Sequence, residues 1–319
     1  MNIDDSVAVC SRSFSKNPSL RSELLTFYKN VKFNDGGTQM KGAELISFLS
    51  GHTKAIVGLE DITAEVLENL PKLKVVSKYG VGLDSIDLAS MRLLNKRLGW
   101  TGGVNRRSVS ELVIGFAISM LRHISESHRE VGSGIWRQHI GGLLSGRTVG
   151  IIGCGYVGKD LVGLLKPFGC EVLVYDIVDY REFYLQHQIK AVSLDELLRF
   201  SDVITLHIPY NSTTKFLLGA DNLSKIKKGA VLINTARGGL VDELALKEML
   251  LTERIAAAAF DVFGIEPPQD LELLNLPNFL ATPHIGGSAR EAILAMGRSA
   301  ISGLDNNEIP TSEFIAQNG

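Results

Sequence analysis

Short apolar runs alternate with helical patterns along most of the chain. In the first hundred residues, the runs at 7–10, 55–57 and 75–76 predict strands. Apolar residues at helical spacing predict helices near residues 18–29, 41–50, 63–69 and 85–94. Such alternation is typical of a parallel sheet covered by helices. The first part of the chain is therefore predicted to be a small α/β domain.

A long helix is predicted to begin at Ser108, because the spacing of Ser108 to Glu111 forms a capping box. Its main apolar stripe runs from Val109 to Ile124, and Ile114 and Ile118 are apolar elsewhere on its circumference. A helix that is apolar on most sides is buried against more than one neighbour. We expect this helix to pack between domains or at a subunit interface, and the glycines after it predict a loose connection.

The strongest pattern lies between Thr148 and Asp176. Residues 149–153 form an apolar run that ends in glycine, residues 157–168 carry apolar side chains at helical spacing, and residues 171–176 predict another strand. This order of strand, helix and strand is that of a nucleotide-binding βαβ unit.

Three glycines occupy the predicted turn of this unit, at Gly153, Gly155 and Gly158. In a dinucleotide site the first makes the turn, the second lets backbone approach a pyrophosphate, and the third lets the helix pack on the strand. Asp176, which lies 18 residues beyond Gly158, can accept hydrogen bonds from the adenosine ribose and would repel a 2′-phosphate. The pattern favours NAD over NADP, and a glycine-rich turn without a ligand is the alternative.

The α/β pattern continues after Asp176. Strands are predicted at 203–207, 230–234 and 256–261, helices at 242–251 and from Ser288 to about Asp305, and a capping box at Ser193. Polar clusters follow the later strands, and they contain Arg237 in 234–239, Glu266 in 261–268 and His284 in 282–287.

These side chains have complementary chemistry. A guanidinium such as Arg237 can bind a carboxylate with two hydrogen bonds. His284 can act as a general acid or base, and Glu266 can orient it and favour its protonated form. Taken singly, each also fits a structural role, as a surface ion pair or a structural histidine.

Two loops of the first domain are also candidates for binding. Residues 11–16 form a polar, basic loop, and residues 78–84 offer glycine-spaced backbone amides that can hold a small anion. Ordinary turns without a ligand are the alternative for both.

Composition narrows the class of protein. The chain has 319 residues, of which 45% are hydrophobic and 21% charged, as in ordinary globular proteins of two domains. A net charge of −2 gives no indication of nucleic acid or of an anionic membrane. The three cysteines have neither metal nor redox spacing, so free thiols in a reducing cytoplasm are expected. The start at Asp4 and Asp5 and the lack of a long apolar run argue against secretion and membrane spanning.

Taken in order, these motifs resemble the D-isomer-specific 2-hydroxyacid dehydrogenases, in particular their phosphoglycerate dehydrogenase-like branch. The resemblance runs from about Ala55 to about Ala300, and the matching stretches are 78–84, 153–158, 234–238, 261–263 with 266–267, and 282–286. It implies that Arg237, Glu266 and His284 are catalytic and that no metal takes part. It also implies a substrate carboxylate held near Val81, Gly82 and Arg237.

The resemblance further implies a set of NAD contacts, which comprises Gly153, Gly155, Tyr156, Val157, Gly158, Asp176, His207, Pro209, Thr235, Ala236, Arg237, Asp261, His284 and Gly286. The family's fold implies a Rossmann doubly wound parallel sheet domain at 104–284, inserted in a smaller flavodoxin-like α/β substrate domain at 1–103 and 285–319. A homodimer through the nucleotide domain is expected. The sequence ends at Gly319, so the regulatory domains of some family members are not expected.

The function implied is NAD-dependent hydride transfer to or from C2 of a small D-2-hydroxy acid, with D-3-phosphoglycerate as the first candidate. Two departures bear on the substrate. Trp100 and Gly102 stand where relatives usually have asparagine and proline, and residues 57–60 lack an arginine that many phosphoglycerate dehydrogenases show. Arg12, with Lys16, is proposed to take over phosphate binding. The alternatives are a glyoxylate or hydroxypyruvate reductase and an NAD-sensing, corepressor-like binding protein.

Overall fold

The chain divides into two compact units in the computed structural model, which describes residues 5–318. One unit comprises Met1–Asn105 and Ala289–Gly319, and the other comprises Arg106–Ser288. The expected boundaries, after residues 103 and 284, lie two and four residues before these limits. Residues 1–4, on which the argument against a targeting segment partly rests, lie outside the described residues.

The first unit is built on a five-stranded parallel sheet. Its strands are β1 (Ser6–Val9), β2 (Asn30–Phe33), β3 (Lys54–Val57), β4 (Val75–Lys78) and β5 (Arg97–Gly99). Their order is β2-β1-β3-β4-β5, which is the flavodoxin-like order.

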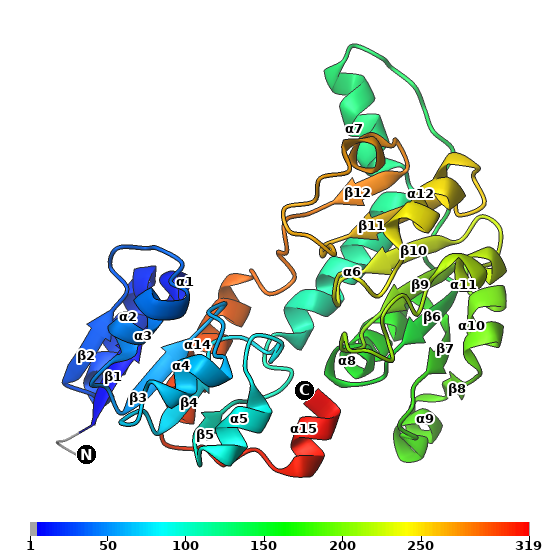
Figure 1. The fold of residues 1–319 in the computed structure, drawn as a ribbon. Helices are drawn as coiled ribbons and strands as arrows, with labels where there is room; N and C mark the ends of the chain where they lie inside the picture. The colour runs from blue at the N-terminus through cyan, green and yellow to red at the C-terminus, as the bar shows by residue number, and fades with distance from the viewer. Residues whose placement is uncertain (1–4, 319) are drawn as a thin grey trace. The chain divides into compact units, whose positions relative to one another are not determined.

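Helices cover both faces of this sheet. They are α1 (Arg12–Lys16), α2 (Pro18–Phe27), α3 (Gly42–Leu49), α4 (Ala64–Glu68), α5 (Leu88–Leu93), α14 (Arg290–Gly303) and α15 (Ser312–Asn318). Successive strand side chains point to opposite faces, so Val7 and Val9 pack with α1, α2 and α14. Ala8 packs with α3, α4 and α5 on the other face (Figure 1).

The second unit is built on a seven-stranded parallel sheet. Its strands are β6 (Thr148–Ile152), β7 (Glu171–Tyr175), β8 (Lys190–Ala191), β9 (Val203–Leu206), β10 (Val231–Asn234), β11 (Ala257–Phe260) and β12 (Phe279–Ala281). Their order is β12-β11-β10-β9-β6-β7-β8, which is the Rossmann order with one added strand. The prediction of a Rossmann doubly wound sheet is confirmed.

The helices of this unit also lie on both faces of the sheet. They are α6 (Arg106–Leu121), α7 (Ile124–Gly132), α8 (Tyr156–Leu165), α9 (Arg181–His187), α10 (Leu194–Phe200), α11 (Ala220–Lys225), α12 (Glu243–Leu251) and α13 (Leu271–Asn275), and a 3₁₀ turn, Lys166–Phe168, follows α8. Helices α6, α8 and α9 share one core with the sheet, and α10 to α13 share the other (Figure 1).

Several local predictions are wrong. Residues 11–16 are not a loop, because the Ser11 hydroxyl accepts a hydrogen bond from the Phe14 N–H and starts α1. Ser108 does not cap the long helix, which already begins at Arg106. Helix α7 was not predicted, and none of its residues is buried. The short strands β2, β5, β8 and β12 were missed as well.

Other predictions about local structure and thiols are confirmed. Ser193 and Glu196 form the expected capping box at α10. All three cysteines are free, and burial is the main cause that raises the pKa of each thiol. The cytoplasmic location remains a prediction.

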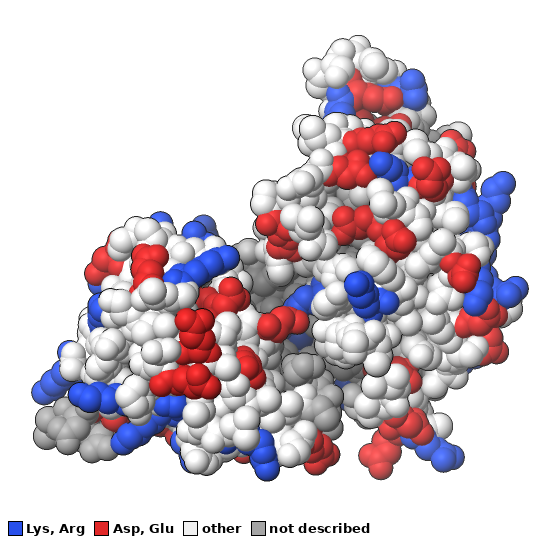
Figure 2. Space-filling model, viewed as in Figure 1, with Lys and Arg blue, Asp and Glu red and all other residues white. Residues whose placement is uncertain are grey.

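The surface and the helices add to this picture. Basic and acidic side chains occur on both units in the view of Figure 2. Within residues 5–318, none of the helices has the length and apolar character needed to cross a bilayer.

Candidate active site

The turn between β6 and α8 has the three glycine roles of a dinucleotide site. Gly153 has φ of +99°, and a Cβ added there would lie 2.7 Å from the His207 carbonyl oxygen. A Cβ on Gly158 would lie 2.2 Å from the Gly153 carbonyl oxygen, so only glycine lets α8 start this close to the turn. A Cβ on Gly155 would meet no described atom within 4 Å. The backbone at Gly155 is therefore open to an incoming group at the N-terminus of α8, where N–H groups favour a pyrophosphate.

Asp176 lies directly beside this turn. Its Oδ2 accepts a hydrogen bond from the Cys154 N–H, and its Oδ1 accepts one from the Val178 N–H at 2.8 Å. The carboxylate is therefore fixed at the end of β7 and next to the glycines, as the prediction of a ribose-binding acid requires. Burial, and then Asp176, raise the pKa of Cys154 to about 12, so the thiol in this turn is a packing group.

The neighbouring strand ends carry further groups that suit a cofactor. His207 Nε2 lies 3.0 Å from Thr205 Oγ1, and burial lowers the pKa of His207 to about 3. The ring is therefore neutral at physiological pH. Thr235 follows β10, and its Oγ1 is buried without a hydrogen-bond partner within residues 5–318. A buried hydroxyl of this kind costs free energy unless a ligand or water satisfies it, so Thr235 fits the predicted contact with NAD.

The remaining predicted cofactor residues lie along the same strand-end edge. Tyr156 and Val157 begin α8, and Tyr156 is exposed. Pro209 follows β9, and Ala236 follows β10. Together with the glycine turn, Asp176 and Thr235, they fit a dinucleotide across the switch point between β6 and β9.

His284 and Glu266 form a direct pair at the same end of the sheet. His284 Nδ1 lies 2.9 Å from Glu266 Oε2. A carboxylate can only accept, so Nδ1 carries the hydrogen and Nε2 is left for a second partner. His284 has φ of +55°, an unusual backbone conformation for a residue with a side chain. Both side chains remain partly exposed, at 50% and 40%, so the pair is accessible to a substrate.

Asp261 fixes the loop that carries His284. Its carboxylate is buried, with 1% of the residue exposed, and it accepts hydrogen bonds from the Thr282 hydroxyl and from the N–H groups of Ile285 and Gly286 at 2.7 Å each. The Ser108 hydroxyl donates to the Gly286 carbonyl at 2.6 Å. These contacts favour a positioning role for Asp261, in addition to the predicted contact with NAD. The hydrogen bonds of Thr282 with Asp261 and of Ser108 with Gly286 were not predicted, because nothing in the local sequence marks such long-range partners.

Arg237 lies in a loop that touches the Glu266 loop. Its Nη1 donates to the Ala236 carbonyl at 2.7 Å, and its own carbonyl accepts from Asn234 Nδ2 at 2.8 Å. A Cβ on Gly238 would lie 1.9 Å from the Phe263 carbonyl oxygen, so glycine is required for the two loops to meet. The Phe263 N–H in turn donates to Glu266 Oε1 at 3.1 Å. The structure thus brings the loops of Arg237, Glu266 and His284 together within one unit.

The predicted substrate residues Val81, Gly82 and Arg12 belong to the other unit. There the Val81 carbonyl accepts a hydrogen bond from Trp100 Nε1 at 3.0 Å. Trp100, which stands where relatives usually have asparagine, therefore supports the 78–84 loop through this hydrogen bond. The sequence did not predict this role. The rings of Phe14 in α1 and Tyr79 in this loop pack edge to face, 5.5 Å apart, so the helix that bears the exposed Arg12 lies beside the same loop.

These features define a class of protein. A Rossmann sheet with a three-glycine turn, an acid at the end of the next strand and a histidine–carboxylate pair at the same edge is the arrangement of an NAD-dependent oxidoreductase. The family model described as "D-isomer specific 2-hydroxyacid dehydrogenase, NAD binding domain" matches residues 114–286, more than half of the chain. The chain belongs to the D-isomer specific 2-hydroxyacid dehydrogenase family, and this confirms the predicted enzyme class and cofactor.

Individual relatives agree with this assignment. A hydroxypyruvate reductase of Thermotoga maritima is 35% identical over 74% of this chain and 78% of its own length. A D-3-phosphoglycerate dehydrogenase of Methanocaldococcus jannaschii is 37% identical over 74% of this chain and 46% of its own length. The chain spans about half the length of the phosphoglycerate dehydrogenases that it matches.

Solved structures share the fold over nearly the whole chain. A Thermus thermophilus protein superposes with a TM-score of 0.82 at 30% identity, covering 96% of this chain and 99% of its own. A D-lactate dehydrogenase of Aquifex aeolicus, complexed with NAD and lactic acid, has a TM-score of 0.82 at 24% identity, covering 93% of each chain.

Proposed function

We propose that this chain transfers a hydride between NAD and C2 of a small D-2-hydroxy acid or 2-oxo acid. The observation that carries the proposal is the His284–Glu266 pair at 2.9 Å, in the unit that carries the glycine turn and Asp176. NAD, when bound, supplies the hydride acceptor, and its reduced form supplies the donor.

The chain's own residues have separate roles in this proposal. The guanidinium of Arg237 holds the substrate's carboxylate and the oxygen on C2. His284, through Nε2, removes the hydroxyl proton during oxidation and returns it during reduction. Glu266 holds the His284 ring through Nδ1 and stabilises the positive charge that appears on the ring. In the other unit, the backbone amides near Val81 and Gly82 remain predicted donors to a substrate carboxylate.

For the substrate, D-3-phosphoglycerate remains the first candidate. Relatives named D-3-phosphoglycerate dehydrogenase support it, and Arg12 and Lys16 provide exposed positive charge at the end of β1. A phosphate needs such charged donors.

Hydroxypyruvate or glyoxylate is the second candidate. In the loop at 57–60, where many phosphoglycerate dehydrogenases have an arginine, the buried Glu60 accepts a hydrogen bond from the Gly58 N–H at 2.7 Å. An acid in this place disfavours a phosphate. The relative named hydroxypyruvate reductase, of which the chain covers 78%, supports the same alternative.

We also propose a homodimer through the nucleotide unit. The segment between α7 and β6 exposes large apolar side chains, namely Ile135 at 47%, Trp136 at 85%, Ile140 at 97% and Leu143 at 67%. Large exposed apolar side chains that gather on one segment are typical of interaction surfaces, and a second copy fits the dimer expected from the family. Size-exclusion chromatography with light scattering, on the wild type and on Trp136→Ser with Ile140→Ser, tests this point. A monomeric wild type would contradict it.

The test of the function is the absorbance of NADH on addition of a panel of 2-oxo acids. Oxidation of NADH by 3-phosphohydroxypyruvate, hydroxypyruvate or glyoxylate supports the proposal, and their relative kcat/KM values separate the two candidates. An NAD-sensing binding protein would bind NADH without turnover on any of them. Binding of NADH without turnover would favour the corepressor-like binding protein over the enzyme.

A further inference from the structure

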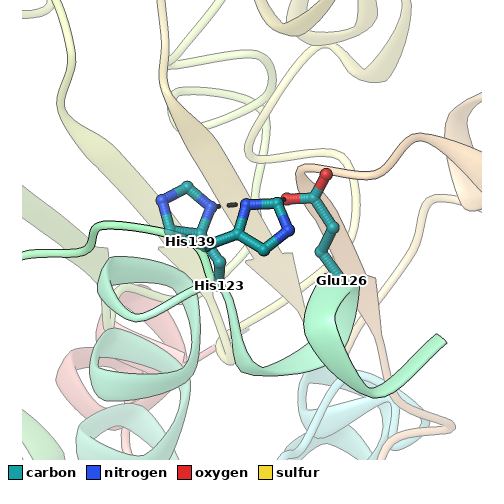
Figure 3. Close-up of side chains that lie close together, drawn as sticks. All are labelled: His123, Glu126 and His139. Atoms are coloured by element: carbon teal, nitrogen blue, oxygen red, sulfur yellow. Dashed lines mark ion pairs between the residues drawn. The ribbon is translucent and has the colours of Figure 1, made fainter. Parts of the chain in front are cut away.

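Two histidines and a glutamate converge at the start of α7, on a part of the second unit that the proposed chemistry does not use. They are His123, Glu126 and His139, and one nitrogen or carboxylate oxygen of each lies within 4.8 Å of the others. Figure 3 shows the two imidazole rings side by side, with the Glu126 carboxylate next to them. The sequence pattern does not predict this cluster, because His139 comes from a segment without regular structure.

The backbone brings these groups together in a defined way. His123 lies between α6 and α7 in a left-handed conformation, with φ of +54°, and Glu126 follows in the first turn of α7. His139 comes from the segment that returns after α7. Its ring is nearly parallel to that of His123, with ring centres 5.2 Å apart.

The distances suit ligands of a common ion better than direct hydrogen bonds. Glu126 Oε2 lies 3.4 Å from His123 Nδ1 and 3.9 Å from His139 Nδ1. The second of these distances is too long for a hydrogen bond. Ligand atoms bound to one Zn²⁺, each about 2.0–2.2 Å from it, lie roughly 3–4 Å apart.

Glu130 prepares His139 for such a role. Its Oε2 lies 2.6 Å from His139 Nε2, and its Oε1 pairs with Arg137 Nη1 at 3.2 Å. Because the carboxylate accepts, Nε2 carries the hydrogen, and Nδ1, which lies 3.9 Å from Glu126 Oε2, is left for a second partner. A carboxylate on the remote nitrogen of a histidine is the usual support for a metal ligand.

We propose that His123, Glu126 and His139 bind a divalent transition-metal ion of the zinc type, with Glu130 as the residue that orients His139. Two imidazole nitrogens and one carboxylate oxygen match the ligand preferences of Zn²⁺, whereas Mg²⁺ and Ca²⁺ require oxygen ligands throughout. Bound metal would fasten the segment around His139 to α7. That segment carries the exposed Trp136 and Ile140, so the ion would stabilise the surface proposed for dimerisation.

The site is partly protected from solvent. The side chains of His139, Glu130 and Glu126 are exposed by 13%, 15% and 23%. His123 is more open, at 42%, and gives the ion access. The competing explanation is a set of ion pairs between protonated histidines and the two glutamates, which needs no metal.

The test is calorimetric titration of Zn²⁺ into the full chain, freed of metal by a chelator and without a polyhistidine tag. We expect one Zn²⁺ per chain in the wild type and its loss in His139→Ala and in Glu126→Gln. Glu130→Gln should bind roughly 10–100-fold more weakly. His128→Ala, which changes an exposed histidine of the same helix, is the matched control and should bind like the wild type. Mg²⁺ should give no binding.

Two further measurements keep the test decisive if a variant folds poorly. Co²⁺ should give the visible absorption of a low-symmetry histidine site in the wild type but not in Glu126→Gln, the most conservative change. Zn²⁺ should also slow tryptic cleavage at Arg137 in the wild type but not in His139→Ala. The proposal would be overturned in favour of plain ion pairs by either of two results. The wild type does not bind Zn²⁺, or the wild type and Glu126→Gln bind it with equal affinity.

Discussion

Glu266 and His284 are joined through one carboxylate oxygen and one ring nitrogen, with Oε2 of the glutamate 2.9 Å from Nδ1 of the histidine. The other oxygen, Oε1, accepts from the Phe263 N–H at 3.1 Å. The carboxylate is therefore held on both sides, and the ring has a defined orientation with Nε2 available for chemistry.

The first prediction concerns the coupling of this pair. His284→Ala should lower kcat by roughly 10²–10⁴-fold, the usual contribution of a general acid or base. Glu266→Gln should lower kcat less, because the amide keeps an oxygen near the ring but loses the charge. Since Glu266 acts through His284, the double variant should be no worse than His284→Ala alone. If the losses measured by steady-state kinetics were fully multiplicative, the two residues would not act as a pair. Glu248→Gln, at an exposed position of α12, serves as the control.

Asp176 should set the choice of cofactor. Its carboxylate is fixed beside the glycine turn by the Cys154 and Val178 N–H groups, where it would repel a 2′-phosphate. Asp176→Ala should narrow the gap between NADH and NADPH by weakening NADH and admitting NADPH, as measured by KM for each cofactor. Asp176→Asn keeps an acceptor oxygen and isolates the effect of charge. A wild type that uses NADPH as well as NADH would contradict this role.

Asp261 should be needed for stability as well as for activity. Without its carboxylate, the N–H groups of Ile285 and Gly286 lose their acceptors. The hydrogen bond of Gly286 is buried, and an unsatisfied buried group costs about 1–3 kcal/mol. Asp261→Ala should lower the free energy of unfolding by roughly 2–4 kcal/mol in urea titrations. Asp261→Asn should cost less. Asp61→Ala, at an exposed position, is the control. If the urea midpoint of Asp261→Ala were unchanged and equal to that of the control, the loop that carries His284 would be stable without the Asp261 carboxylate.

His207 should make the fold sensitive to acid. Burial lowers its pKa from 6.5 to about 3 in the folded chain, so between these values the unfolded chain binds a proton that the folded chain does not. The contribution of the neutral His207 ring to the free energy of unfolding is complete above pH 6.5. It is lost progressively as the pH falls toward 3. In His207→Gln, the free energy of unfolding should fall less steeply with falling pH, by at most ~1.4 kcal/mol per pH unit. Parallel curves for variant and wild type would show that the ring does not resist protonation.

Arg12 should matter only for a phosphorylated substrate. If it binds the phosphate, Arg12→Ala loses a charge-assisted contact and should raise KM for 3-phosphohydroxypyruvate by roughly 10–100-fold. Activity with glyoxylate or hydroxypyruvate should barely change. Equal losses on both kinds of substrate would show that Arg12 supports the fold of α1 instead.

The nucleotide unit was the easier part to predict, because its elements carry strong local signals. Apolar runs rich in β-branched residues predict buried strands, and glycines next to them predict the turns where the strands end. This combination occurs at the Gly153 turn and before the cluster of Arg237. Elements without such signals were missed. Helix α7 buries no residue, and β8 has only two residues.

The hydrogen bonds that hold the loops of the candidate site could not be predicted from local sequence either. The Ser108 hydroxyl finds its partner at Gly286, 178 positions away, and Trp100 finds the Val81 carbonyl across a loop. The same limit applies to His139, whose neighbours Glu126 and Glu130 lie on the preceding helix α7. A sequence pattern reports the period of an element but not which side chains meet after folding.

The central claim is that this chain is an NAD-dependent 2-hydroxyacid dehydrogenase that depends on His284. The most direct measurement is the initial rate of NADH oxidation with hydroxypyruvate and with 3-phosphohydroxypyruvate, for the wild type and for His284→Ala, together with NADH affinity by fluorescence. The account predicts turnover of at least one acid by the wild type, and a variant that still binds NADH but has lost most of its turnover. A wild type that binds NADH and reduces neither acid, or a His284→Ala variant that turns over at the wild-type rate, would contradict it.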